Sequence, residues 1–232
     1  MMKMFKNNCT FFFVFILSLA GFQNLYAQEN DFIDKELVKQ LRGIRHEFDE
    51  NMKPYDYKTD PDLYGKKFSF FYSEKITKLN NLYNRLYDQD TVSEGLAVDI
   101  KGFGTNQNPE IIEKIDESVP PAIMIQSDSP KFQVIEDYRQ VENIQQVLAF
   151  RKRFSENFPN VNDLSEDDTY CDLNFVLDTD GKIKKIKYKG GREFCLISAI
   201  HMYSLRNQGK PLQFQGKPIK IYLKQPIRLK VE

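Results

Sequence analysis

The sequence contains no tryptophan, only two histidines and three cysteines, and no excess of charge, because 33 basic residues balance 33 acidic ones. The balanced charge gives no support to a protein that binds polyanions through its net charge. The content of 41% apolar and 28% charged residues is typical of globular proteins. It excludes a collagen-like, mucin-like or wholly disordered chain.

The sequence also lacks an apolar run long enough to cross a bilayer at its start. Residues 1–27 contain two lysines, an apolar run over Phe11–Phe22 and a small residue, Ala27, before the expected cut. This pattern predicts a cleaved signal peptide. A helix of twelve residues spans about 18 Å, short of the roughly 30 Å hydrocarbon core, which argues against an uncleaved anchor. We therefore expect a periplasmic or secreted mature chain without a transmembrane segment, from which Cys9 has been removed.

The neutral overall charge conceals two halves of opposite sign. Residues 181–232 contain thirteen basic residues against two acidic ones, a net charge of +11, which leaves −13 for residues 28–180. Such asymmetry can indicate nucleic acid or an acidic lipid surface as a partner. Export and the even spread of the lysines argue against nucleic acid. The simpler interpretation is a solvated basic face, which the acidic half can cover.

Residues 28–120 are predicted to be a mostly helical N-terminal region, to which no motif assigns a role. Apolar residues recur at helical spacing over residues 30–52, and a second helix is predicted from Ser73 onward. The aromatic run Phe68–Tyr72 indicates a short strand, and Leu96–Ile100 indicates another. Prolines then mark residues 121–132 as a linker to a second domain at 133–232.

The second domain has the pattern helix, strand, strand, helix, strand. A helix is predicted over residues 141–157, and a hairpin over Cys171–Tyr188, in which apolar and polar residues alternate around a turn at Asp178–Gly181. A helix over Phe194–Leu205 follows. The last segment, residues 219–231, alternates apolar with mostly basic residues, as expected for a strand lying on helices. The predicted fold class is α+β, with a small antiparallel three-stranded sheet packed on helices.

Several spaced motifs in residues 130–232 resemble the C-terminal domain of TonB-type energy transducers. They are the turn Asp178-Thr179-Asp180-Gly181-Lys182-Ile183, the pair Phe158-Pro159 after a helix, Pro211, the triplet Gly216-Lys217-Pro218, and Pro226-Ile227. Two features differ from the family. Gly209 stands where the family has a tryptophan, and the chain has neither an uncleaved anchor nor a long proline-rich spacer.

The resemblance implies a binding role for the last strand. In that family this strand accepts an extended segment of an outer-membrane receptor, which adds to the edge of the sheet. By this resemblance the partner-binding edge consists of Ile219, Lys220, Ile221, Tyr222, Leu223, Lys224 and Gln225. Two alternatives remain open: the N-terminal half covers the edge, or the edge pairs with itself in a homodimer.

Two cysteines remain after export, and export favours their oxidation. Cys171 is in register with the apolar face of its strand, and Cys195 lies four residues before Ala199 on the following helix, so both are expected at the interface between sheet and helix. A disulfide there would close a loop of roughly 25 residues and stabilise the fold by about 3 kcal/mol. Two buried free thiols are the alternative.

No pattern of residues indicates catalysis. His46 has no second histidine at the spacing of a zinc site, His201 is expected at the surface of its helix, and no histidine is placed to activate a cysteine. We therefore expect no enzyme activity, no cofactor and no metal. The predicted function is that of a protein-binding module of the cell envelope. The alternatives are a self-contained structural protein, and an enzyme housed in the N-terminal half.

Overall fold

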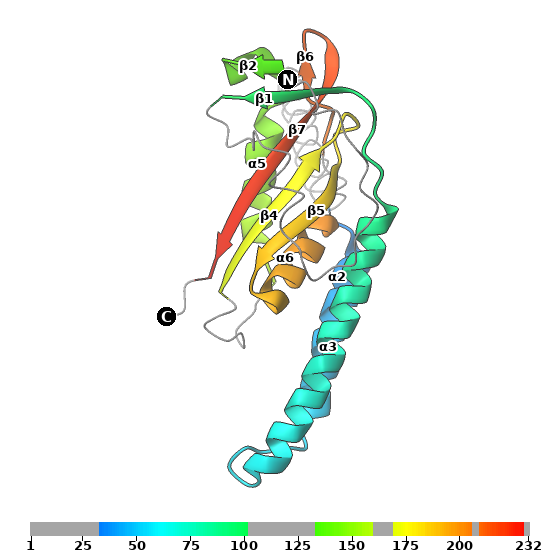
Figure 1. The fold of residues 1–232 in the computed structure, drawn as a ribbon, viewed down its shortest axis with the longest axis vertical. Helices are drawn as coiled ribbons and strands as arrows, with labels where there is room; N and C mark the ends of the chain where they lie inside the picture. The colour runs from blue at the N-terminus through cyan, green and yellow to red at the C-terminus, as the bar shows by residue number, and fades with distance from the viewer. Residues whose placement is uncertain (1–32, 102–132, 160–168, 206–208, 230–232) are drawn as a thin grey trace, which may run out of the picture.

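The computed structural model describes residues 33–101, 133–159, 169–205 and 209–229. The expected signal peptide and the linker at 121–132 lie outside these residues. The described chain forms a sheet with helices on one face, and a long helical hairpin that extends beyond it (Figure 1). The α+β class predicted from the sequence is confirmed.

The sheet is larger than predicted. Five strands lie in the order β2-β1-β7-β4-β5, and the expected three-stranded antiparallel sheet is therefore wrong. β4, β5 and β7 are antiparallel neighbours as expected, but β1 pairs in parallel with β7, and β2 pairs in parallel with β1. The strands are β1 (Leu96–Ile100), β2 (Gln133–Ile135), β4 (Tyr170–Leu177), β5 (Ile183–Gly190) and β7 (Lys217–Arg228).

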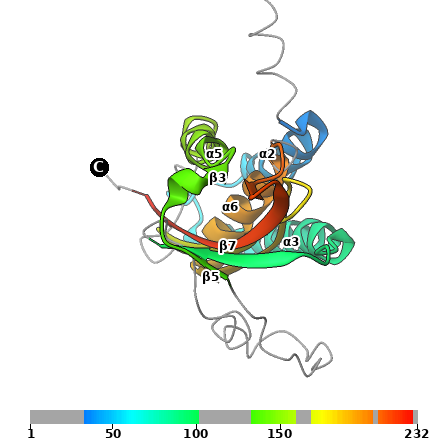
Figure 2. The same ribbon diagram turned by 90° about the horizontal axis from the view of Figure 1, so that it is seen from above.

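Shorter elements extend the sheet next to the start of β7, at the top of Figure 1. β6 (Gln213–Phe214) pairs with β7 across a turn and also with β3 (Val141–Glu142), which follows the 3-10 helix η1 (Tyr138–Gln140). The sheet is curled, and α5 (Gln145–Glu156) and α6 (Arg192–Ser204) lie on its concave side (Figure 2). The core lies between this side and the helices, with Leu173, Ile186, Phe194 and Ile200 fully buried.

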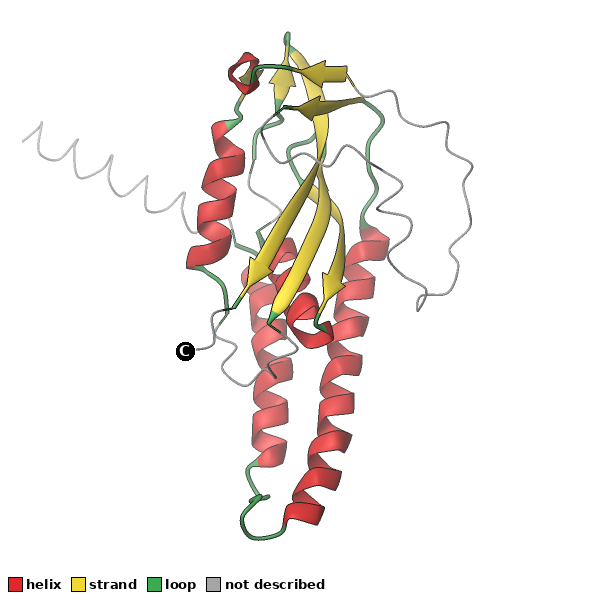
Figure 3. Ribbon diagram, turned by 60° about the vertical axis from the view of Figure 1, so that its left-hand side comes forward, coloured by secondary structure: helices red, strands yellow, loops and turns green. Residues whose placement is uncertain are grey.

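The N-terminal helices form an antiparallel hairpin. α2 (Lys35–Met52) begins at Asp34, whose side chain accepts the Leu37 N–H, and α3 (Pro61–Gln89) begins at Asp60, which accepts the Leu63 N–H. Both are regular N-caps. The half of α3 nearer its end packs on α6 through buried Ile76, Leu79, Leu82 and Leu86. The other half projects away from the sheet (Figure 3).

The aromatic run Phe68–Tyr72 lies inside α3, so the short strand predicted there is wrong. Tyr64, Phe68 and Tyr72 are spaced by four residues, and their rings stack along one side of the helix at centroid distances of 6.1 and 5.6 Å. Aromatic rings four residues apart pack on one another along a helix, so an aromatic run is compatible with a helix as well as with a strand.

Candidate functional site: the edge of β7

β7 is a central strand over its first part. On one side its register with β4 runs from Ile221–Leu177 to Arg228–Tyr170. On the other side Ile219, Lys220 and Ile221 pair with Leu96, Ala97 and Val98 of β1. The prediction that Ile219–Gln225 presents a continuous free edge is therefore corrected at Ile219–Ile221, where a strand of the chain's own N-terminal region occupies that side.

Beyond Ile221 no described strand pairs with β7 on the side away from β4. The backbone N–H of Leu229 donates to the Thr169 carbonyl at 2.9 Å, so the odd-numbered residues of β7 direct their polar backbone groups at β4. Lys224, Pro226 and Arg228 therefore direct theirs to the opposite side. We call Lys224–Arg228 the open edge.

Pro226 restricts what the open edge can bind. It stands opposite Asp172 of β4 and supplies no N–H, so the open edge has backbone donors at Lys224 and Arg228 but none between them. The Pro226 carbonyl accepts a hydrogen bond of 3.0 Å from the side-chain amide of Gln225. Proline on an edge strand is a known protection against indiscriminate strand addition. Only a short segment can pair here without losing hydrogen bonds.

The two faces of β7 differ as the alternating pattern predicted. Ile219, Ile221 and Leu223 are buried against the helices. On the opposite, basic face, the Lys220 ammonium donates to the Ser93 carbonyl at 2.9 Å, and the Lys224 ammonium lies 2.6 Å from Asp172 Oδ2. The hydrogen bond to Asp172 raises the pKa of Lys224, which therefore stays charged.

Burial raises the pKa of Tyr222, between these two lysines, and Asp178 raises it further. The phenol therefore stays neutral and presents an uncharged hydroxyl on the basic face.

An open hollow of about 290 Å³ lies at the end of the open edge, lined by Thr169, Tyr170, Arg228 and Leu229. The Arg228 guanidinium lies 5.3 Å from the centre of the Tyr170 ring, within the range of a cation–π contact. A hydrogen bond with Asp172 raises the pKa of Tyr170. Neither residue was expected from the sequence to belong to the site, although Arg228 follows the same alternation as Lys220 and Lys224.

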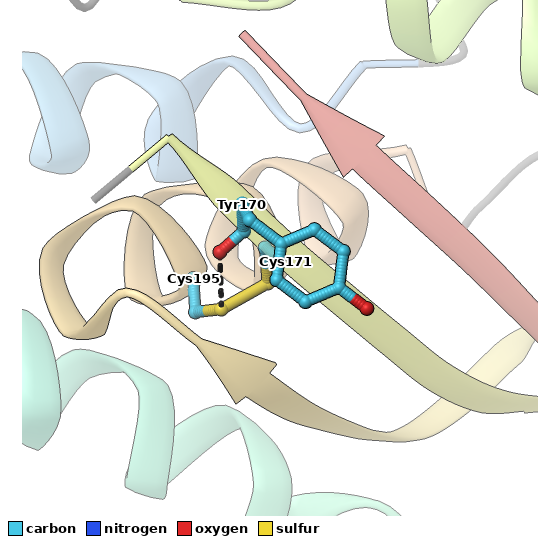
Figure 4. The surroundings of a disulfide bond; sticks show 3 residues. All are labelled: Tyr170, Cys171 and Cys195. Atoms are coloured by element: carbon cyan, nitrogen blue, oxygen red, sulfur yellow. Dashed lines mark hydrogen bonds between the residues drawn. A yellow bond between two sulfur atoms is a disulfide. The ribbon is translucent and has the colours of Figure 1, made fainter. Parts of the chain in front are cut away.

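The disulfide between Cys171 and Cys195 is present, so the alternative of two free thiols is wrong. It joins β4 to α6 with the two Cα atoms 5.3 Å apart, and both residues are fully buried. The Cys195 sulfur lies 4.0 Å from the Tyr170 carbonyl oxygen. Figure 4 shows both beside the disulfide. Cys171 stands opposite Ile227, so the covalent link braces the strand that supports the open edge.

The N-terminal region is fastened to the β4–β5 turn next to β7. Asp178 is fully buried, and its carboxylate accepts the Ser93 N–H at 2.8 Å and the Lys184 ammonium at 2.6 Å. Burial alone would raise the pKa of Asp178, but the hydrogen bonds from Lys184, Ser93 and Thr179 outweigh it and lower the pKa. The first acidic residue of the β4–β5 turn thus anchors the segment that leads into β1.

The same turn lies close against Gly209. Gly181 has φ +79°, and a Cβ on it would lie 2.4 Å from the Gly209 carbonyl oxygen. A Cβ on Gly209 would in turn lie 2.8 Å from Gln146 Oε1. A cavity of about 30 Å³ lies beside Gly209, so little free space remains next to this glycine.

The two histidines lie apart and in different surroundings. His46 is exposed on α2, 3.7 Å from Glu50. His201, expected at the surface of its helix, is instead buried between the rings of Phe154 and Phe158, and its Nε2 lies 3.1 Å from the Phe154 carbonyl oxygen. Burial lowers the pKa of His201 to about 4.

The position of β1 beside β7 was not expected from the sequence. Leu96–Ile100 was predicted as a strand, but not as a neighbour of β7. Four of its five residues are buried, including Asp99, which is the pattern of a strand covered on both faces. The short apolar run Leu-Ala-Val was the available signal for an inner strand.

No family model, curated protein or solved structure matches the chain. Among the described helices, none combines the length and apolar character needed to cross a membrane. Within residues 33–101, 133–159, 169–205 and 209–229, no group of three or more histidine, cysteine or acidic side chains is arranged to hold a metal ion.

Proposed function

We propose that this protein is an exported, non-enzymatic binding module of the cell envelope, which docks an extended segment of a protein partner on the open edge of β7. The partner is a periplasmic or outer-membrane protein, by the resemblance to the TonB C-terminal domain. The observation that carries the proposal is the side of Lys224–Arg228 on which no strand of the described residues pairs with β7, although β4 pairs along the other side. Unpaired backbone groups of this kind accept an added strand.

Two features support a specific rather than a general docking site. The disulfide and the buried neighbours of Cys171 hold β4, and hence the open edge, in a fixed position, which reduces the entropy cost of binding. The basic face beside it, with Lys224 and Arg228, favours acidic side chains on the same face of the incoming strand.

The test compares two substitutions at one position. Lys224→Ala removes the side chain and its ion pair with Asp172, whereas Lys224→Pro also removes the backbone N–H that faces the open edge. A photo-crosslinking amino acid placed at Gln225 identifies the partner in living cells. A peptide of the crosslinked partner segment is then titrated against both variants by calorimetry.

We expect the alanine variant to bind and the proline variant to bind at least about tenfold more weakly, because one main-chain hydrogen bond is lost and the ring obstructs the edge. Unfolding midpoints of the two variants control for stability. Equal affinity of the two variants for the peptide would refute strand addition at this edge.

A second candidate is a self-contained structural protein whose sheet is completed by its own N-terminal region. The pairing of β1 with β7 and the bonds of Ser93 to Asp178 and Lys220 support it. In that case crosslinks from Gln225 stay within the chain in living cells. An intermolecular crosslink to one reproducible envelope protein would contradict this candidate.

A further inference from the structure

The projecting half of α3 carries an apolar stripe on the side that faces away from the rest of the molecule. We define the outer face of α3 as Leu63, Lys66, Phe70, Glu74 and Thr77, all of which are exposed. The buried residues of α3 lie on the opposite side of the helix, at Ile76, Leu79, Leu82 and Leu86. The contacts of α3 with α2, α6 and β5 therefore leave the outer face uncovered by the described residues.

Two large apolar side chains stand on this outer face. Leu63 is 42% exposed and Phe70 is 57% exposed. They are seven residues apart, which places them two turns apart along one line of the helix. Figure 2 shows α3 at the rim of the molecule, and Figure 3 shows the projecting half of the hairpin clear of the sheet. A partner can therefore approach the whole length of the stripe.

We propose that the outer face of α3 pairs with the same face of a second copy of this chain, antiparallel, about a two-fold axis that passes at Phe70. In this arrangement the two Phe70 rings meet at the axis. Leu63 of each chain packs on Thr77 of the other. Each Lys66 then faces Glu74 of the other chain. An isologous contact of this type is the common form of a homodimer.

Charge complementarity favours this occupant and this orientation. Lys66 and Glu74 are equally spaced on either side of Phe70, so the antiparallel pairing forms two opposite-charge contacts across the axis. A parallel pairing would set Lys66 against Lys66 and Glu74 against Glu74, which is unfavourable. The antiparallel arrangement also aligns the helix dipoles favourably.

A membrane surface fits the same residues less well. The end of the hairpin carries three carboxylates, of Asp56, Asp60 and Asp62, against the two ammonium groups of Lys53 and Lys58, so it has no excess of positive charge to attract anionic lipids. Carboxylates are repelled by anionic lipids and are costly to bury. The apolar stripe also runs along the helix rather than around its tip. These features favour a second helix as the partner.

The contact rests on one helix face per chain, so it is expected to bury less than the roughly 800 Å² per partner of a typical stable interface. We therefore expect a dimer that dissociates on dilution. This inference does not depend on the proposed docking site, because the outer face of α3 and the open edge of β7 share no residue.

Sedimentation equilibrium of the mature chain over a range of concentrations tests the proposal. The wild type is expected to dimerise reversibly, and Phe70→Lys to raise the dissociation constant at least about tenfold, because it sets two ammonium groups together at the axis. Leu148→Lys is the matched control. Leu148 is 45% exposed on α5, away from the hairpin, and its substitution should leave the dissociation constant unchanged.

A charge exchange tests the orientation. Lys66→Glu and Glu74→Lys should each weaken the dimer, whereas the double variant K66E/E74K should restore it, because each exchanged charge meets its opposite on the other chain. A wild type that stays monomeric at all concentrations would overturn the proposal. So would a dimer unaffected by Phe70→Lys, or a monomer that binds phosphatidylcholine vesicles through Phe70.

Discussion

Lys75 of α3 and Glu193 of α6 form a buried ion pair that fastens the helical hairpin to the α/β part of the molecule. The ammonium lies 2.8 Å from the carboxylate, with the two side chains only 10% and 6% exposed. The same ammonium lies 4.0 Å from the centre of the Phe48 ring of α2. One cation thus joins three helices.

Replacing Lys75 by methionine should destabilise the fold by about 3–5 kcal/mol, because it leaves the Glu193 carboxylate buried without a partner. The double variant K75M/E193Q should recover most of the loss. Urea unfolding followed by circular dichroism measures both. Equal stability of the single and double variants would show that Glu193 reaches water when Lys75 is absent.

His201 should make the stability depend on pH between about 6.5 and 4. Burial lowers its pKa to about 4 in the folded state, whereas the unfolded chain binds the proton near pH 6.5. The free energy of unfolding is therefore highest above about pH 6.5, where His201 is neutral in both states. It falls as the pH decreases, and the total loss is about 3 kcal/mol below pH 4.

The measurement is the free energy of unfolding of the wild type and of His201→Phe between pH 8 and pH 4. The difference between the two should change only in this window. The remaining titratable groups, such as the Asp178 carboxylate, affect the unfolding free energy of both proteins equally, so their contributions cancel in the difference. Parallel curves throughout the range would contradict the buried neutral state of His201.

The disulfide should contribute about 3 kcal/mol in the chain-entropy model, since it joins residues 24 positions apart. The variant C171A/C195A and the wild type in reducing agent should lose similar amounts of unfolding free energy. Alanine is used because both positions are fully buried. No loss in either case would mean that the link adds nothing beyond the packing of β4 on α6.

Beyond Tyr222, hydrogen exchange should alternate along β7 between slow amides that bond to β4 and faster amides on the open edge. The amides of Ile221 and Leu223 point to β4 and that of Lys220 to β1, so all three should exchange slowly. The amides of Lys224 and Arg228 face the open edge and should exchange faster by about 100-fold or more. Uniform protection along β7 would show that a further segment covers the open edge.

The sequence predicted the parts of the fold whose pattern is local. The hairpin of β4 and β5, α5, α6 and the alternating faces of β7 were expected from periodicity, and β1 was expected as a strand at Leu96–Ile100. In each case neighbouring residues decide the structure. The disulfide also followed, because register placed Cys171 and Cys195 at one interface.

The errors came from interactions between distant residues. The aromatic run Phe68–Tyr72 suits a strand by composition, but Pro61 and the Asp60 cap start a helix that continues through it. The edge of β7 was misjudged because the pairing partner of Ile219–Ile221 lies in another region of the sequence. The prediction that His201 lies at the surface was wrong because the rings that bury it, Phe154 and Phe158, come from α5 and the residues after it.

The parallel pairing of β1 with β7 has a consequence for folding order. Leu96 and Ile219 are 123 residues apart, whereas the β4–β5 hairpin joins residues a few positions apart across its turn. Closing so long a loop costs entropy that only the finished contact repays, which slows folding. We therefore expect the hairpin and α6 to form early, and the pairing of β1 with β7 to be a late step that joins the N-terminal region to the last strand.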